Sequence, residues 1–85
     1  MAIEILYFAR LREIIGHGGE RVEPPVDVAT VGSLADWLAT LSDGHAEAFA
    51  DRERLRAAVD QAFARPNTSI AGAREIAFFP PVTGG

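Results

Sequence analysis

The chain ends on two glycines, and the chemistry that such an ending offers is that of the terminal carboxylate. The last nine residues read AFFPPVTGG. Pro80 and Pro81 restrict φ and favour an extended path, so residues 80–85 reach roughly 20 Å from the domain. Glycines have no Cβ and therefore fit a channel that is too narrow for other residues. We predict an arm that delivers the Gly85 carboxylate into a partner's active site, formed by Pro80, Pro81, Val82, Thr83, Gly84 and Gly85.

The composition excludes most other kinds of covalent chemistry. The chain of 85 residues has no cysteine, so it has no thiol nucleophile, no disulfide and no Cys-ligated metal. All 8 basic residues are arginine, so no lysine side chain is present to form a Schiff base. The reactive group is therefore expected to be Gly85 itself or to belong to a partner protein.

Side chains suited to acid–base chemistry are present but scattered. His17 lies in a glycine-rich turn and His45 follows an expected helix end, so both are predicted to be solvated surface residues. Glu20 and Glu23 form a carboxylate pair, but the sequence does not indicate a cleft that would hold them. Ser33 is expected to be a helix N-cap rather than a nucleophile. These residues do not predict an internal active site.

The charge balance bears on the choice of partner. The chain has 12 acidic residues against 8 basic ones, for a net charge of -4. Binding to nucleic acid or to an anionic membrane without sequence preference requires clustered basic side chains. No stretch has the apolar length of a membrane span, and no basic-then-apolar leader precedes the first strand-like segment. We therefore expect a cytoplasmic protein with neither a nucleic-acid nor a membrane partner.

The segments that must position the arm begin almost at the N-terminus. Residues 2–9, AIEILYFA, alternate as a strand with one face more apolar than the other. Residues 10–20 hold a short helical piece that three glycines close. Residues 21–28 read as an extended segment, which its two prolines confine to a sheet edge or to a strand's end.

The second half of the chain begins with the clearest helix. Its apolar stripe follows i, i+3, i+4, i+7 spacing, with Ser33 as N-cap and Gly44 as C-cap. Residues 45–54 could be a second helix or a loop, residues 55–64 read as one strand, and residues 74–79 as the last strand. The predicted core residues of the helix are Leu34, Trp37, Leu38 and Leu41.

This order of elements predicts an α+β fold of the β-grasp type. The first and last strands are the most apolar, so we expect them to be a parallel central pair in a mixed sheet. The helix covers one face and leaves the other face open. Residues 1–79 are predicted to form the β-grasp domain, and residues 80–85 the extended Gly-Gly tail.

Three aromatic side chains are candidates for partner docking on the open face. Alternation along the last strand places Phe79 on that face, the same one expected for Phe8. Phe63 joins them if its strand is a neighbour. Together they would form an exposed apolar patch of the kind that marks a partner site. In the alternative interpretation, Phe79 covers a core edge and Phe8 lies under a loop.

The two ends of the chain resemble one known family. ILYFARLREIIG near the start and EIAFFPPVTGG at the end are similar to the small subunits of molybdopterin synthase, which are ubiquitin-like sulfur carriers, and the likeness covers essentially the whole chain. The resemblance implies that an E1-like adenylating enzyme uses ATP to adenylate the Gly85 carboxylate. A desulfurase or sulfurtransferase system then supplies the sulfur of a Gly85 thiocarboxylate.

The resemblance also implies where that sulfur goes. The chain would dock on the large synthase subunit, within a heterotetramer, and insert its tail into that subunit's active site. There the sulfur passes to cyclic pyranopterin monophosphate, towards the dithiolene of molybdopterin, in molybdenum cofactor biosynthesis; each chain supplies one of the two dithiolene sulfurs. The chain itself would bind no cofactor and would not be catalytic alone.

Three other interpretations stay open at the level of sequence. A carrier of the same fold could serve thiamine synthesis or tRNA thiolation, although such carriers generally lack the proline pair. A ubiquitin-like modifier would be joined through Gly85 to lysines of other proteins. A small binding domain could have a tail that only packs on an edge strand.

Overall fold

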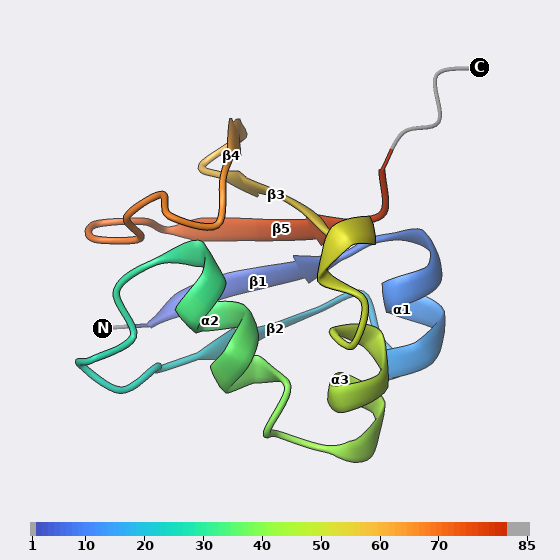
Figure 1. Cartoon of the computed structure of the whole chain (residues 1–85). Coiled ribbons are helices and arrows are strands. Elements are labelled where there is room, and N and C mark those ends of the chain that lie inside the picture. Colours follow the sequence, from blue (N-terminus) through green and yellow to red (C-terminus); the bar gives the residue numbers. More distant parts are fainter. Residues whose placement is uncertain (1, 82–85) are drawn as a thin grey trace.

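The computed structural model describes residues 2–81. Val82, Thr83, Gly84 and Gly85, which the sequence predicts to carry the chemistry, lie outside the described residues. In chain order the elements are β1 (Ile3–Tyr7), α1 (Ala9–Ile15), β2 (Gly19–Val22), α2 (Val31–Leu38), α3 (Asp43–Ala48), the 3-10 helix η1 (Arg52–Arg54), β3 (Arg56–Val59), β4 (Ala62–Ala64) and β5 (Glu75–Phe79) (Figure 1).

The strands form one mixed five-stranded sheet in the order β2-β1-β5-β3-β4. β1 and β5 pair in parallel at its centre, as predicted, and the other neighbours pair antiparallel. The helices gather on one face of the sheet (Figure 1). This is the α+β, β-grasp architecture expected from the sequence.

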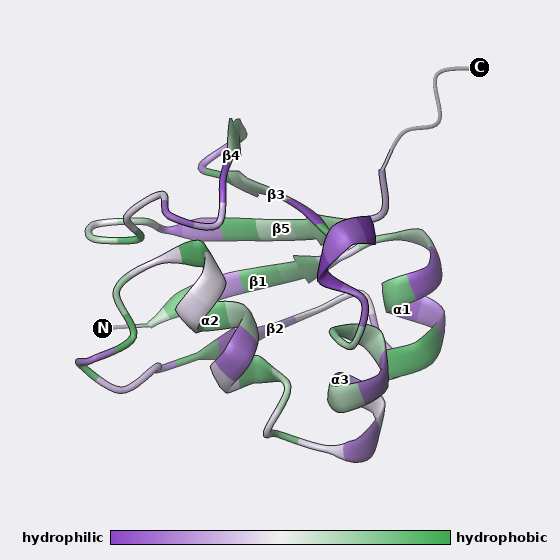
Figure 2. Cartoon of the chain, viewed as in Figure 1, coloured by the Kyte–Doolittle hydropathy of each residue, from purple (hydrophilic) through white to green (hydrophobic). Residues whose placement is uncertain are grey.

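Alternation along the central strands builds the core. On β1 the buried side chains are Ile3, Ile5 and Tyr7, and on β5 they are Ile76 and Phe78. Both strands are coloured largely as hydrophobic in Figure 2, because even their other face carries several apolar residues. Full burial of one such side chain contributes about 1.5–3 kcal/mol, so this pair of strands makes a large contribution to stability.

The main helix is shorter than its apolar stripe suggested. Its N-cap is Thr30 rather than Ser33: the Thr30 hydroxyl accepts from Ser33 N, and the Ser33 hydroxyl accepts in return from Thr30 N. This reciprocal arrangement is a capping box, with Ser33 in its third helical position. The helix ends at Leu38, so Leu41 lies beyond it and is 40% exposed, while Trp37 is half-buried. The prediction that Leu41 belongs to the core was wrong, whereas Trp37 packs against the core.

Gly44 is not a C-cap. It lies inside α3, whose N-cap is Ser42. The segment 45–54, for which the sequence allows a helix or a loop, contains most of α3 and all of η1. β2 is an edge strand that ends at Val22, and Pro24 follows its end. Proline has no N–H to donate to a strand ladder, so this position is the expected one.

Residues 55–64 form a hairpin and not the single strand that was predicted. The chain reverses at Asp60 and Gln61, which adopt left-handed φ values of 47° and 72°. Two such residues make the primed turn that suits a two-residue hairpin, although glycine or asparagine usually marks it. Here the Asp60 carboxylate accepts from Arg74 N (3.0 Å) and Glu75 N (2.9 Å), so bonds to the residue before β5 and to its first residue hold the turn.

No helix within residues 2–81 has both the length and the apolar character to cross a membrane.

Candidate functional site

The predicted arm starts from the centre of the sheet. β5 has a hydrogen-bonded neighbour on each side, β1 and β3, and it ends at Phe79. Pro80 and Pro81 follow directly and are half-buried, and Figure 1 shows the chain leaving the sheet at this end of β5. An inner strand is held by two ladders, so it is a more rigid base for the arm than a frayed edge.

An apolar row crosses the face of the sheet that the helices leave open. Leu6 of β1 is in register with Ala77 of β5, Ala77 with Ala58 of β3, and Ala58 with Phe63 of β4. None of these four residues is buried. Phe79 lies two positions beyond Ala77 and therefore on the same face. We call these five residues the open-face patch.

The three aromatic residues predicted for docking differ in their contacts. The rings of Phe63 and Phe79 are 6.1 Å apart, and Phe63 is 87% exposed. Phe8 follows β1 with extended backbone (φ -121°, ψ 154°), so alternation places it on the side of Leu6, and it is 48% exposed. Phe8 therefore does not lie under a loop. The structure brings Phe63 and Phe79 together and places Phe8 beside the start of the arm; their docking role stays a prediction.

Charged residues border the patch. Arg56 is the register partner of Phe79, and Glu4 and Glu75 are opposite each other where β1 and β5 begin to pair. An apolar centre with a charged rim is typical of surfaces that bind another protein without being obligate interfaces.

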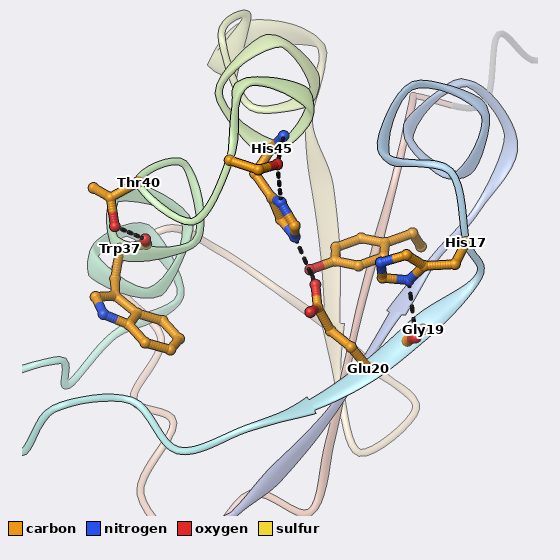
Figure 3. A network of polar contacts seen from close by, with 8 residues as sticks. His17, Gly19, Glu20, Trp37, Thr40 and His45 are labelled. Carbon is orange, nitrogen blue, oxygen red and sulfur yellow. Dashed lines mark hydrogen bonds and ion pairs between the residues drawn. The ribbon is translucent and has the colours of Figure 1, made fainter.

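A polar network on the helix side was not predicted. The Tyr7 hydroxyl donates to Glu20 Oε2 at 2.6 Å, and His45 Nε2 lies 2.6 Å from the same oxygen. His45 Nδ1 lies 2.7 Å from the Ser42 hydroxyl. Figure 3 shows His45 pointing from its helix towards Glu20 on the strand. We call these four residues the clasp, because they join α3 to β1 and β2.

The expectation that both histidines are solvated surface residues was wrong for His45. It is buried, at 7% exposure, and it lies within α3 rather than after a helix end. His17 is exposed, but its ring centroid is 6.3 Å from that of His45 and 6.0 Å from that of Tyr7. The sheet thus brings together two histidines that are far apart in the sequence (Figure 3).

The electrostatics of the clasp favour an ionised Glu20. Burial raises the pKa of this carboxyl, but the hydrogen bonds from Tyr7 and His45, together with electrostatic interactions with His45 and His17, lower it by more. The net result is a pKa below the ordinary 4.5. Burial, followed by the bond to the Glu20 carboxylate, raises the pKa of the Tyr7 hydroxyl. Tyr7 is therefore a neutral donor to a charged acceptor, which makes a strong hydrogen bond.

The order Ser42, His45, Glu20 invites comparison with a hydrolase triad, but its contacts are those of a structural group. The Ser42 hydroxyl also accepts from His45 N at 3.1 Å as the N-cap of α3, and Tyr7 shares the carboxylate oxygen that His45 contacts. In residues 2–81, every buried polar side-chain atom has a partner. No cluster of three or more His, Asp or Glu residues there is arranged to hold a metal ion.

Comparison with known proteins shows which family the chain belongs to. Residues 5–85 match the ThiS family. Two curated relatives, from Escherichia coli (strain K12) and Haemophilus influenzae, are 40% and 36% identical over 83 residues. In both cases the alignment covers 98% of this chain and 99% of the relative, and both relatives are named molybdopterin synthase sulfur carrier subunit.

A solved structure agrees over the full length. SAMP1, the small archaeal modifier protein 1 of Haloferax volcanii, is 30% identical, with a TM-score of 0.71 and complete coverage of both chains. The chain is therefore similar both to carriers named for sulfur and to a protein named as a modifier.

Proposed function

The chain belongs to the ThiS family, and from that premise we propose that it is the sulfur carrier subunit of a molybdopterin synthase. The observation that carries the proposal joins structure and sequence. The central strand β5 ends at Phe79 in the open-face patch, and the sequence continues from there through Pro80 and Pro81 to a Gly-Gly ending. Near full-length similarity to two relatives with that name supports it.

The first step of the proposed mechanism activates Gly85. A carboxylate is a poor electrophile, so an E1-like adenylating enzyme transfers AMP from ATP to it and releases pyrophosphate. A sulfide equivalent from a desulfurase or sulfurtransferase system then attacks the acyl carbon and displaces AMP. The product is a thiocarboxylate at Gly85. The ATP belongs to the activating partner, and this chain contributes only the carboxylate and its presentation.

The second step delivers the sulfur. Phe79, Phe63 and Phe8 dock on the large subunit, and the arm from Pro80 to Gly85 enters that subunit's active site. The thiocarboxylate sulfur passes there to cyclic pyranopterin monophosphate, towards the dithiolene of molybdopterin. Because β5 is held on both sides, docking also fixes where the arm begins, which lowers the entropy lost on insertion.

Intact mass after co-expression with the activating enzyme and a sulfur source tests the carrier role. We expect a gain equal to the replacement of one oxygen by sulfur, confined to the C-terminal peptide. The matched control is the chain without Gly85, which should keep its mass and, because a solvated terminus contributes little to the fold, its melting temperature. An unchanged mass, or a change elsewhere in the chain, would contradict the proposal.

A second candidate, a protein modifier joined through Gly85 to lysines of other proteins, is favoured by the similarity to SAMP1. The chain has no lysine, so it cannot form chains on its own side chains. Peptide mass spectrometry of cells expressing it distinguishes the two. Lysine side chains bearing the C-terminal Gly-Gly would support the modifier, and their absence alongside a thiocarboxylate would support the carrier.

A further inference from the structure

A second surface feature lies on the helix side of the sheet. A hollow of about 320 Å³ opens between α2, the start of β3 and the end of β4. Its floor consists of core residues that are all buried: Val31, Ala35, Ala57 and Phe78. Neither the open-face patch nor the clasp contributes a residue to its lining.

Small side chains explain why the hollow exists. Ala35, Ala57 and Ala64 face it from three elements, where larger residues would fill the space. The backbones of α2 and the loop after β4 meet at one end, because Gly32 N donates to Pro66 O at 2.8 Å. A Cβ at Gly32 would lie only 3.1 Å from that oxygen, so the close approach depends on glycine.

The mouth of the hollow is positively charged in a chain that is negative overall. Arg52, Arg56 and Arg65, three of the chain's 8 basic residues, line it, and no Asp or Glu does. Arg52 is neutralised in part by Asp36, at 2.6 Å. Arg56 donates only to the carbonyls of Glu53 and Leu55, and within residues 2–81 neither Arg56 nor Arg65 forms an ion pair.

We propose that this hollow is a second protein-docking site, which takes an apolar side chain of a partner segment flanked by Asp or Glu. The floor offers no polar side chain to orient a small molecule, whereas ligand pockets place a few polar groups inside. The charges instead surround the mouth from η1, β3 and the residue after β4. That arrangement fits carboxylates spaced along a peptide on either side of one buried anchor.

The proposed site goes beyond the sulfur-carrier function and does not depend on it. Phe78 lines the hollow and Phe79 belongs to the open-face patch, and successive residues of a strand face opposite sides of the sheet. A segment bound in the hollow therefore leaves the five residues of the patch free. Arg56 is next to both regions, because it starts β3 beside Phe79 and also lines the hollow. The chain can be held from both faces at once.

Titration of the purified, isotope-labelled chain by NMR tests the proposal. The probe is the acetylated and amidated peptide Asp-Asp-Phe-Asp-Asp, and its matched control is Asn-Asn-Phe-Asn-Asn. At low salt we expect the acidic peptide to bind at least about fivefold more tightly, with most of that difference lost at high salt. Amide shifts should concentrate at Val31, Gly32 and Ala57.

Two variants separate charge from shape. Combined Arg56→Gln and Arg65→Gln should reduce the preference for the acidic peptide to less than about twofold, while combined Arg21→Gln and Arg74→Gln, at exposed positions outside the hollow, should retain it. Ala64→Leu should weaken both peptides. Equal binding of the two peptides, no shifts at millimolar peptide, or shifts centred on the open-face patch would each overturn the proposal.

Discussion

Phe78 and Phe79 are adjacent residues of one type on one strand, yet they belong to different regions of the molecule. Phe78 is fully buried, and its ring lies 5.0 Å from that of Phe49 in the core. Phe79 is half-buried on the other face and contacts Phe63, whose ring is almost fully exposed. Burial on the core side stabilises the fold. On the open face apolar surface stays exposed to water, which is unfavourable unless a partner covers it.

The comparison predicts that the two regions can be damaged independently. Changes on the core side should lower the free energy of unfolding. Changes on the open face should lower the affinity for the large subunit and leave the fold intact.

The largest expected effect is that of Phe78→Ala. Removing a fully buried aromatic side chain should destabilise the protein by about 3–5 kcal/mol, because it loses its transfer free energy and leaves a cavity. Denaturant unfolding followed by circular dichroism measures this. Phe79→Ala is the matched control and should cost less than about 1 kcal/mol. An equal decrease in the free energy of unfolding for the two variants would show that the core side and the open face do not differ in their contribution to stability.

If the Phe78→Ala variant does not fold, Phe78→Leu and Phe79→Leu are compared in the same unfolding experiment. Phe78→Leu keeps an apolar side chain and should cost less, yet still more than Phe79→Leu.

Glu20→Ala should have the next largest effect. The Tyr7 hydroxyl and His45 lose their shared acceptor, and a buried polar group without a partner costs about 1–3 kcal/mol. Glu23→Ala, at an exposed position nearby, is the control and should change stability by no more than about 0.5 kcal/mol. Thermal unfolding of both variants checks this. A stability loss no larger than that of the control would show that the clasp does not support the fold.

Phe79→Ala should act on binding. We expect the affinity for the large synthase subunit to fall by more than about 1 kcal/mol, as for an aromatic anchor in an interface. Isothermal titration calorimetry measures it, with Val26→Ala as control because Val26 is an apolar residue that is fully exposed outside the open-face patch. Unchanged affinity for Phe79→Ala would remove this residue from the docking surface.

The smallest expected effect is a pH dependence from the clasp. The pKa of Glu20 is lower in the folded protein than the ordinary 4.5, so Glu20 contributes stability above that pH. This contribution is lost as the pH falls through the folded-state pKa. Comparing the melting temperatures of the protein and its Glu20→Gln variant between neutral and acidic pH checks the sign: the difference should shrink on acidification. A difference that grows would contradict the assignment.

Much of the fold follows from local patterns in the sequence. Alternation in β1 and β5 predicts both faces of the central pair, and it places Phe79 and Phe8 correctly relative to the core. The Gly-Gly ending predicts Gly85 as the reactive residue on chemical grounds alone, and this stays a prediction because residues 82–85 lie outside what the structure describes.

The features that were missed depend on contacts between distant residues. The turn at Asp60 has no glycine, and it is held by bonds from the Asp60 carboxylate to the amides of Arg74 and Glu75, 14 and 15 residues away. Tyr7 and His45 lie 13 and 25 residues from Glu20, so no local pattern joins them. One signal does point to α3: Ser42 stands three residues before His45, which is the spacing of an N-cap and its amide partner. Gly44, a residue typical of helix ends, masks that signal.

The most direct test of the central claim is a single-turnover reaction. The thiocarboxylated chain is mixed with the purified large subunit and cyclic pyranopterin monophosphate, and the intact mass of the chain is followed together with dithiolene formation. We predict that the mass returns to that of the Gly85 carboxylate as molybdopterin appears, with two chains consumed for each dithiolene, because each chain carries one sulfur. A chain that keeps its sulfur in the presence of both, or loses it without forming the dithiolene, would contradict the proposed function.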